Sequence, residues 1–88
     1  MSKLMEFSKY LKAKRVQAGL TQADAAKKLG YSSPQFISNW ERGLARPPVK
    51  IIKRLVPMYK LDIDELIEVY MRLPVAKLRS ALSRTTKK

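Results

Sequence analysis

The sequence contains no cysteine and no histidine. Without cysteine the chain has neither disulfides nor a thiolate nucleophile, and a fold that needs no oxidation suits a reducing compartment. The two absences together remove the usual zinc ligands and the commonest general base. We therefore expect no metal, no cofactor and no catalysis, and we predict that the protein is not an enzyme.

Long hydrophobic runs are also missing. No apolar stretch approaches the roughly 20 residues of a membrane span, and charges interrupt the N-terminal segment too often for a secretory signal. With 88 residues, of which 45% are hydrophobic, the chain has room for one small core. We expect one cytoplasmic protein with no membrane contact.

Acidic residues are scarce, since 7 Asp and Glu face 19 Lys and Arg and the formal net charge is +12. Such a charge attracts polyanions, so nucleic acid is the leading candidate partner. Residues 61–73 reverse the sign, with four acids and a single base, and are a poor candidate for a surface that faces phosphates. After Pro74 the chain is basic again.

Apolar spacing and capping residues predict an all-α chain with five helices and no strand. We expect helices at about 3–18, 22–29, 34–42, from 49 onward, and 62–73. Thr21 and Asp24 form a capping-box pattern for the second helix, whereas Ser33 and Pro34 suit the cap and first position of the third. Pro57 predicts a kink or an early end in the fourth helix.

The third expected helix divides into two faces at about 100° per residue. Phe36, Ile37 and Trp40 fall on the inward face, where burial explains Trp40 better than a stacking role does. The outward face carries polar side chains of moderate length, namely Gln35, Ser38, Asn39 and Arg42. A short helix with a polar face that follows a turn is the geometry of a helix-turn-helix reader of the major groove.

The segments LTQADAAKKLG, beginning at Leu20, and ISNWERG, beginning at Ile37, make residues 7–70 resemble the Cro and lambda-repressor type (Xre-like) DNA-binding domain. The resemblance implies a compact five-helix lambda-repressor-like domain that binds double-stranded DNA sequence-specifically, commonly as a repressor and as a homodimer on a two-fold symmetric operator. We place this domain at residues 1–73, its helix-turn-helix unit at about 21–43, and a basic C-terminal tail at 74–88.

The turn before the third helix, YSSPQF, has one residue more than is usual in the family. Counting back from Ile37 places Ser33, Pro34 and Gln35 at the N-terminal base-reading positions and Asn39 one turn later. Gln35 and Asn39 are the best candidates, because a carboxamide can bond an adenine edge in bidentate fashion. Ser33 and Ser38 complete the predicted base-reading set, with a phosphate contact left open for Ser38.

Phosphate contacts are expected at four positions. The resemblance places Gln22 as a backbone clamp at the start of the second helix, where helix N–H groups also favour an anion. The other three, Arg42, Arg46 and Lys50, flank the recognition helix and the loop after it. Arg15 and Glu41 match a pair that forms an internal ion pair in the family, and we assign them a structural role.

Two alternatives to a sequence-specific regulator stay open. The chain could be the antitoxin of a toxin–antitoxin pair, binding a protein partner through residues 62–73 or the tail. It could also coat nucleic acid without reading sequence, through its high positive charge. The tail itself has three possible roles: forming a short helix that dimerises, embracing DNA, or staying disordered.

Overall fold

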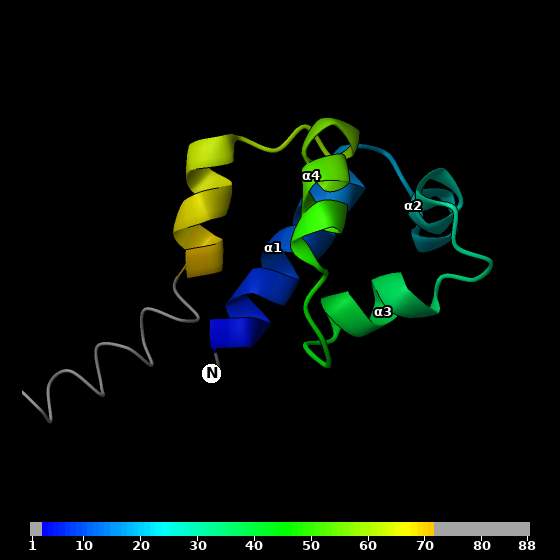
Figure 1. Cartoon of the computed structure of the whole chain (residues 1–88), viewed down its shortest axis with the longest axis horizontal. Helices are drawn as coiled ribbons and strands as arrows, with labels where there is room; N and C mark the ends of the chain where they lie inside the picture. The colour runs from blue at the N-terminus through cyan, green and yellow to red at the C-terminus, as the bar shows by residue number, and fades with distance from the viewer. Residues whose placement is uncertain (1–2, 72–88) are drawn as a thin grey trace, which may run out of the picture.

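The computed structural model describes residues 3–71, which form helices joined by short loops (Figure 1). In chain order these are α1 (Lys3–Gln17), α2 (Gln22–Leu29), α3 (Gln35–Glu41) and α4 (Val49–Met58), followed by a fifth helix that covers residues 63–71. Residues 3–71 contain no strand, so the predicted all-α, five-helix fold is confirmed. None of these helices has the length and hydrophobicity that a membrane crossing requires. The tail expected at 74–88 lies outside the described residues.

Helix α2 has the predicted bounds, and local chemistry fixes both of its ends. The Thr21 hydroxyl accepts the backbone N–H of Asp24 at 3.0 Å, while the Asp24 carboxylate accepts the backbone N–H of Thr21 at 2.9 Å. This bond from the Thr21 backbone is the main reason that the pKa of Asp24 is lowered. At the other end Gly30 has φ 86, a left-handed conformation that glycine adopts without steric cost.

Helix α4 continues through Pro57 and ends one residue later. The proline lies in the last turn, so only one backbone hydrogen bond inside the helix is lost. Beyond it, the N–H of Tyr59 still bonds the carbonyl of Leu55 at 2.8 Å. Pro57 therefore lies inside α4, in its last turn, and the helix ends at Met58.

The fifth helix begins at a cap made by Asp62. The carboxylate of Asp62 accepts the N–H of Asp64 at 3.0 Å, and its carbonyl accepts the N–H of Leu66 at 2.9 Å. Glu65, three residues after the cap, forms an ion pair with Lys14 of α1 at 3.3 Å. This acidic helix is thereby tied to α1.

The core draws side chains from all five helices and from the residues that follow α4. Trp40, only 3% exposed, lies inside it as predicted. Phe36 does not, because its ring is 52% exposed, and the expectation of an inward Phe36 is wrong. The buried apolar residues are Phe7, Leu11, Ala25, Ala26, Leu29, Ile37, Trp40, Ile52, Leu55, Tyr59, Leu61 and Leu66.

Candidate nucleic-acid interface

Residues 30–34 turn the chain between α2 and α3, and α3 lies along one edge of the described domain (Figure 1). The carbonyl of Pro34 accepts the first helical bond of α3, from the N–H of Ser38 at 2.9 Å. Pro34 is thus the N-cap rather than the first helical residue, and the expected start of α3 is wrong by one position. Its ψ of 9 lies outside the helical range, and the Ser33 hydroxyl reaches the N–H of Gln35 only at 3.4 Å.

Three polar side chains form a hydrogen-bonded row on the outward face of α3. The Oδ1 atom of Asn39 accepts one bond from Nε2 of Gln35 at 3.0 Å and another from Nη2 of Arg42 at 3.3 Å. The spacing of four and then three residues puts the three side chains on one side of the helix. Asn39 and Ser38 are partly exposed, whereas Gln35, Arg42 and Ser33 are exposed. The helix therefore presents an ordered polar surface.

An aromatic stack supports the turn beside this row. The rings of Tyr31 and Phe36 lie 4.8 Å apart between centroids, tilted by 30°. Tyr31 in turn meets the buried Trp40 edge-on at 6.0 Å. Tyr31, the first side chain of the turn after Gly30, packs between the exposed ring of Phe36 and the buried ring of Trp40. Sequence reasoning missed this because helical angle alone put Phe36 inward.

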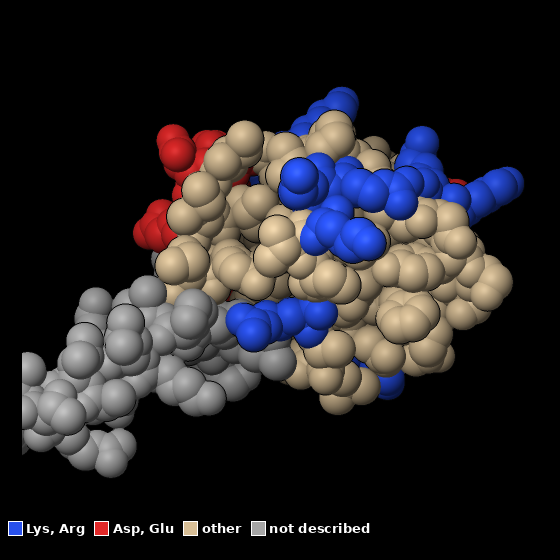
Figure 2. All heavy atoms as spheres, viewed as in Figure 1, with Lys and Arg blue, Asp and Glu red and all other residues tan. Residues whose placement is uncertain are grey.

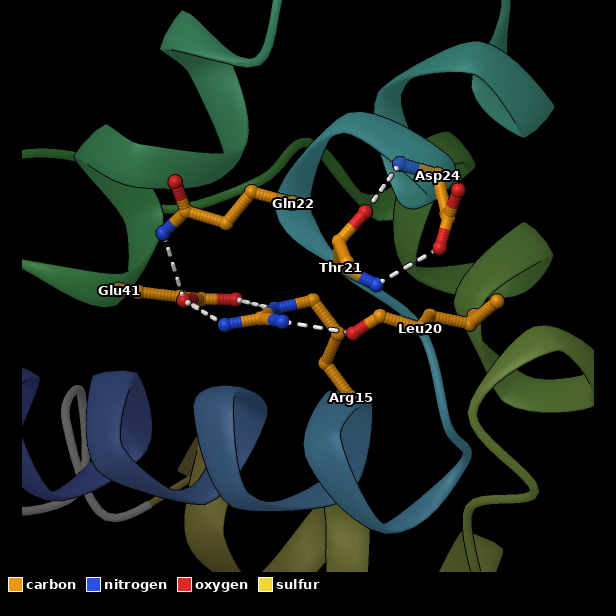
Figure 3. A network of polar contacts seen from close by, with 6 residues as sticks. All are labelled: Arg15, Leu20, Thr21, Gln22, Asp24 and Glu41. Atoms are coloured by element: carbon orange, nitrogen blue, oxygen red, sulfur yellow. Dashed lines mark hydrogen bonds and ion pairs between the residues drawn. The ribbon is translucent and has the colours of Figure 1, made fainter.

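On the opposite side of α3, a buried network joins three helices (Figure 3). Glu41 accepts Nε of Arg15 at 2.6 Å and Nη2 at 2.9 Å, and also Nε2 of Gln22 at 3.0 Å. Nη1 of Arg15 donates to the carbonyl of Leu20 at 2.7 Å. The side chains of Arg15 and Glu41 are only 8% and 3% exposed. This network contains the ion pair that the resemblance implied, and it fixes α3 against α1 and the start of α2.

The network also accounts for two pKa shifts. Hydrogen bonding to Glu41 raises the pKa of the Arg15 guanidinium, which stays charged. Burial, and then the negative charge of Glu41, raises the pKa of Tyr59 to about 12. A buried anion raises the pKa of neighbouring groups, and both shifts have the sign expected for Arg15 and Tyr59 beside the Glu41 carboxylate.

A further brace comes from Arg54, which sequence reasoning did not single out. From α4 its guanidinium donates to the carbonyls of Leu29 at 3.1 Å and Lys28 at 2.9 Å, at the C-terminal end of α2. Those carbonyls have no partner within the helix, and their partial negative charge favours a cation. The only signal in the sequence was a basic residue on α4, and the sequence does not reveal which helix end it faces.

The four residues expected at phosphates have different surroundings. The side chain of Gln22 is half-buried and bonded to Glu41, and Arg42 bonds Asn39 in the outward row. The Arg46 guanidinium lies 5.6 Å from the ring centroid of Tyr70, on the fifth helix. Lys50 is exposed in the first turn of α4.

A model of the helix-turn-helix family of the Cro/C1 type matches residues 11–66, which is well over half of the chain. The match covers the capping box, the turn, the outward row and the buried network. The chain belongs to the Cro/C1-type, Xre-like helix-turn-helix family. No curated protein and no solved structure matches it.

As a Cro/C1-type domain the protein is a DNA-binding helix-turn-helix regulator. In helix-turn-helix proteins the second helix of the motif lies in the major groove, and here that helix is α3. Lys and Arg gather over α4 and α2 on the face drawn in Figure 2, whereas Asp and Glu gather at the far end, over the fifth helix. The acidic end of this Cro/C1-type domain is thus separated from its helix-turn-helix end.

Proposed function

We propose that this regulator binds specific double-stranded DNA sequences in a repressor-like manner and places α3 in the major groove. The observation that carries the proposal is the outward row of Gln35, Asn39 and Arg42. Its side chains are ordered by their own hydrogen bonds, and they lie on the helix face opposite the buried Glu41 network.

The row has the donors and acceptors that a base edge requires. Because Oδ1 of Asn39 already accepts two bonds, Oε1 of Gln35 is left as an acceptor and Nδ2 of Asn39 as a donor. Adenine presents one donor and one acceptor in the major groove, so the two carboxamides complement an adenine edge either together or singly. Ser33 and Ser38 flank the row as further polar contacts, to a base or a phosphate.

Phosphate contacts position the domain on the duplex. We assign them to Arg42, Arg46, Lys50 and Gln22, whose amide keeps a second N–H after donating to Glu41. If roughly 6 to 10 phosphates are contacted, affinity falls by about 10³ to 10⁵ between 50 and 200 mM salt. A protein that binds DNA in this way would be located on the cytoplasmic nucleoid.

Selection of bound duplexes from a random pool tests the proposal, because it reports specificity, half-site symmetry and spacing together. With the selected duplex, the double variant Gln35→Ala, Asn39→Ala should lose affinity for cognate DNA and keep its affinity for random DNA. The matched control is Gln17→Ala, which removes an exposed carboxamide from α1. Arg42→Ala should weaken both duplexes comparably. Equal loss on both duplexes in the double variant would refute the base-reading assignment.

We further propose that the domain binds DNA as a homodimer through an apolar hollow between α4 and the fifth helix. The hollow measures about 140 Å³ and is lined by Val49, Ile52, Leu66, Ile67, Tyr70 and Met71. On the fifth helix, Ile63, Ile67 and Met71 form a stripe at four-residue spacing, and they are 57%, 52% and 45% exposed.

A second copy of the chain is the occupant that the charges favour. On the fifth helix, Asp64 and Glu68 directly follow the stripe residues Ile63 and Ile67, and on α4 Lys53 directly follows Ile52, which lines the hollow. A two-fold contact sets the acids of one copy against the bases of the other, which offsets the repulsion between two strongly positive chains. The dimer would place its two α3 helices about 34 Å apart along the DNA.

Sedimentation with and without DNA tests the dimer. Ile67→Glu should shift the chain to a monomer and reduce affinity for a two-half-site operator, while affinity for a single half-site is retained. Val16→Glu, at a residue 58% exposed on α1, is the matched control and should leave the dimer intact. A wild-type chain that stays monomeric on its operator would contradict the dimer. A 1:1 complex with a different protein at this stripe would also contradict it and would favour the antitoxin alternative. A specificity ratio near one in the duplex selection would instead favour non-specific coating.

A further inference from the structure

Phe36 is an apolar side chain at the exposed surface of a recognition helix that is otherwise polar outward. Its ring is 52% exposed. The inward positions of α3 are filled by Ile37, Trp40 and Glu41 instead. The ring makes no part of the buried core. Burial in the core therefore does not account for a phenylalanine at this position.

The ring is nevertheless held in place. It packs on Tyr31 at 4.8 Å between centroids, and Tyr31 contacts Trp40, which is 3% exposed. A side chain anchored in this way loses little further freedom when it binds a ligand, so its contact energy is kept for binding.

The position of Phe36 on α3 puts it beside the base-reading row. It follows Gln35 directly and lies three residues before Asn39, and residues three apart are neighbours on a helix surface. At about 100° per residue it falls on the flank of the row, on the side of the turn. A base pair that Gln35 and Asn39 read therefore has an adjacent step within reach of the ring.

We propose that Phe36, backed by Tyr31, is a specificity-determining contact for the 5-methyl group of a thymine next to the base that Gln35 and Asn39 read. The inference rests on the proposed function, since it requires α3 to lie in the major groove. The thymine methyl is the one apolar group that the four bases present there, and aromatic contact with it is a known means of readout. Burying one methyl is worth about a fourfold change in affinity.

Replacing thymine by deoxyuridine tests this, because the substitution removes only the methyl group. In the duplex obtained by selection, each thymine is replaced singly and the dissociation constant is measured for wild type, Phe36→Ala and Phe36→Leu. For wild type, one position per half-site should weaken by about fourfold. Phe36→Ala should bind the thymine and deoxyuridine duplexes equally, and Phe36→Leu should keep part of the difference.

Two controls separate a lost contact from a damaged fold. Val16→Ala removes an exposed apolar side chain from α1 and should keep the full thymine preference. Thermal unfolding of the Phe36 variants reports whether the stack with Tyr31 supports α3, and Phe36→Leu serves if Phe36→Ala does not fold.

The outcomes distinguish this inference from the proposed function on which it rests. If selection yields a consensus but no thymine whose replacement separates wild type from the Phe36 variants, the methyl contact is refuted and sequence-specific binding stands. If selection yields no consensus, sequence-specific binding fails and the methyl contact fails with it.

Discussion

Two polar networks of similar composition lie on opposite sides of α3. On the inner side, Glu41 accepts bonds from a guanidinium and a carboxamide, and its side chain is 3% exposed. On the outer side, Asn39 also accepts bonds from a guanidinium and a carboxamide, but its donors Gln35 and Arg42 are exposed. The main difference between the two networks is access to water.

That difference assigns them opposite roles. In the inner network water cannot replace a lost partner, so removal of one group leaves a buried charge uncompensated. In the outer network water, or a base edge, can replace any partner at little cost. One short helix is thus fixed against the domain on one side and free to exchange partners on the other, which suits the base-reading role proposed for it.

The largest expected effect comes from breaking the inner network. Glu41→Ala leaves the Arg15 guanidinium buried without its anion and should lower the free energy of unfolding by about 3–5 kcal/mol. This is a large part of the roughly 5–15 kcal/mol that stabilises a small domain. Asn39→Ala, in the outer network, should change it by less than about 0.5 kcal/mol. Urea unfolding followed by circular dichroism measures both.

The pair Arg15→Met, Glu41→Leu sharpens this result. Replacing both charges by apolar groups removes the unpaired charge, so the double variant should recover much of the stability that Glu41→Ala loses. Equal costs for Glu41→Ala and Asn39→Ala would abolish the distinction between the two networks.

A second effect, of up to about 3 kcal/mol, is expected at alkaline pH from Tyr59, which is buried and lies near the charge of Glu41. Its pKa is raised to about 12 in the folded chain, so the unfolded chain releases the phenol proton first as the pH rises. The contribution is therefore complete below about pH 10 and is lost as the pH rises from about 10 to 12. Urea unfolding at pH 9, 10 and 11 should show the wild-type free energy falling more steeply than that of Tyr59→Phe. Parallel pH profiles would show that Tyr59 titrates alike in both states.

Much of this architecture follows from local sequence signals. The capping box of Thr21 and Asp24 and the glycine at position 30 define α2 through contacts within a few residues, so periodicity and capping rules predict its bounds. Ile37, Trp40 and Glu41 are spaced three and four residues apart, so helical periodicity puts them on one face, and that face is the buried one. The pairing of Arg15 with Glu41 followed from the resemblance, since 26 residues separate the two.

The features that sequence reasoning missed depend on tertiary neighbours. Phe36 lies at the boundary between the two faces of α3, and its ring packs on Tyr31, a residue of the turn before α3. The predicted start of α3 is one residue early, because the ψ of 9 at Pro34 lies outside the helical range. No rule based on one helix predicts that Arg54 reaches the end of another, because helical periodicity gives a face but not its neighbour.

Arg54 offers the smallest expected effect and lies between the two networks in exposure. Its bonds to Lys28 and Leu29 are partly accessible to water, so Arg54→Ala should lower the free energy of unfolding by about 1 kcal/mol. Lys53→Ala, at the neighbouring exposed lysine of α4, should change it by less than about 0.5 kcal/mol. Because the bond holds the last turn of α2, amide hydrogen exchange at residues 28–31 should quicken in Arg54→Ala and not in Lys53→Ala. Equal exchange in the two variants would mean that the α2 end is held by Gly30 and the core alone, and that only the Glu41 network braces the helix-turn-helix unit.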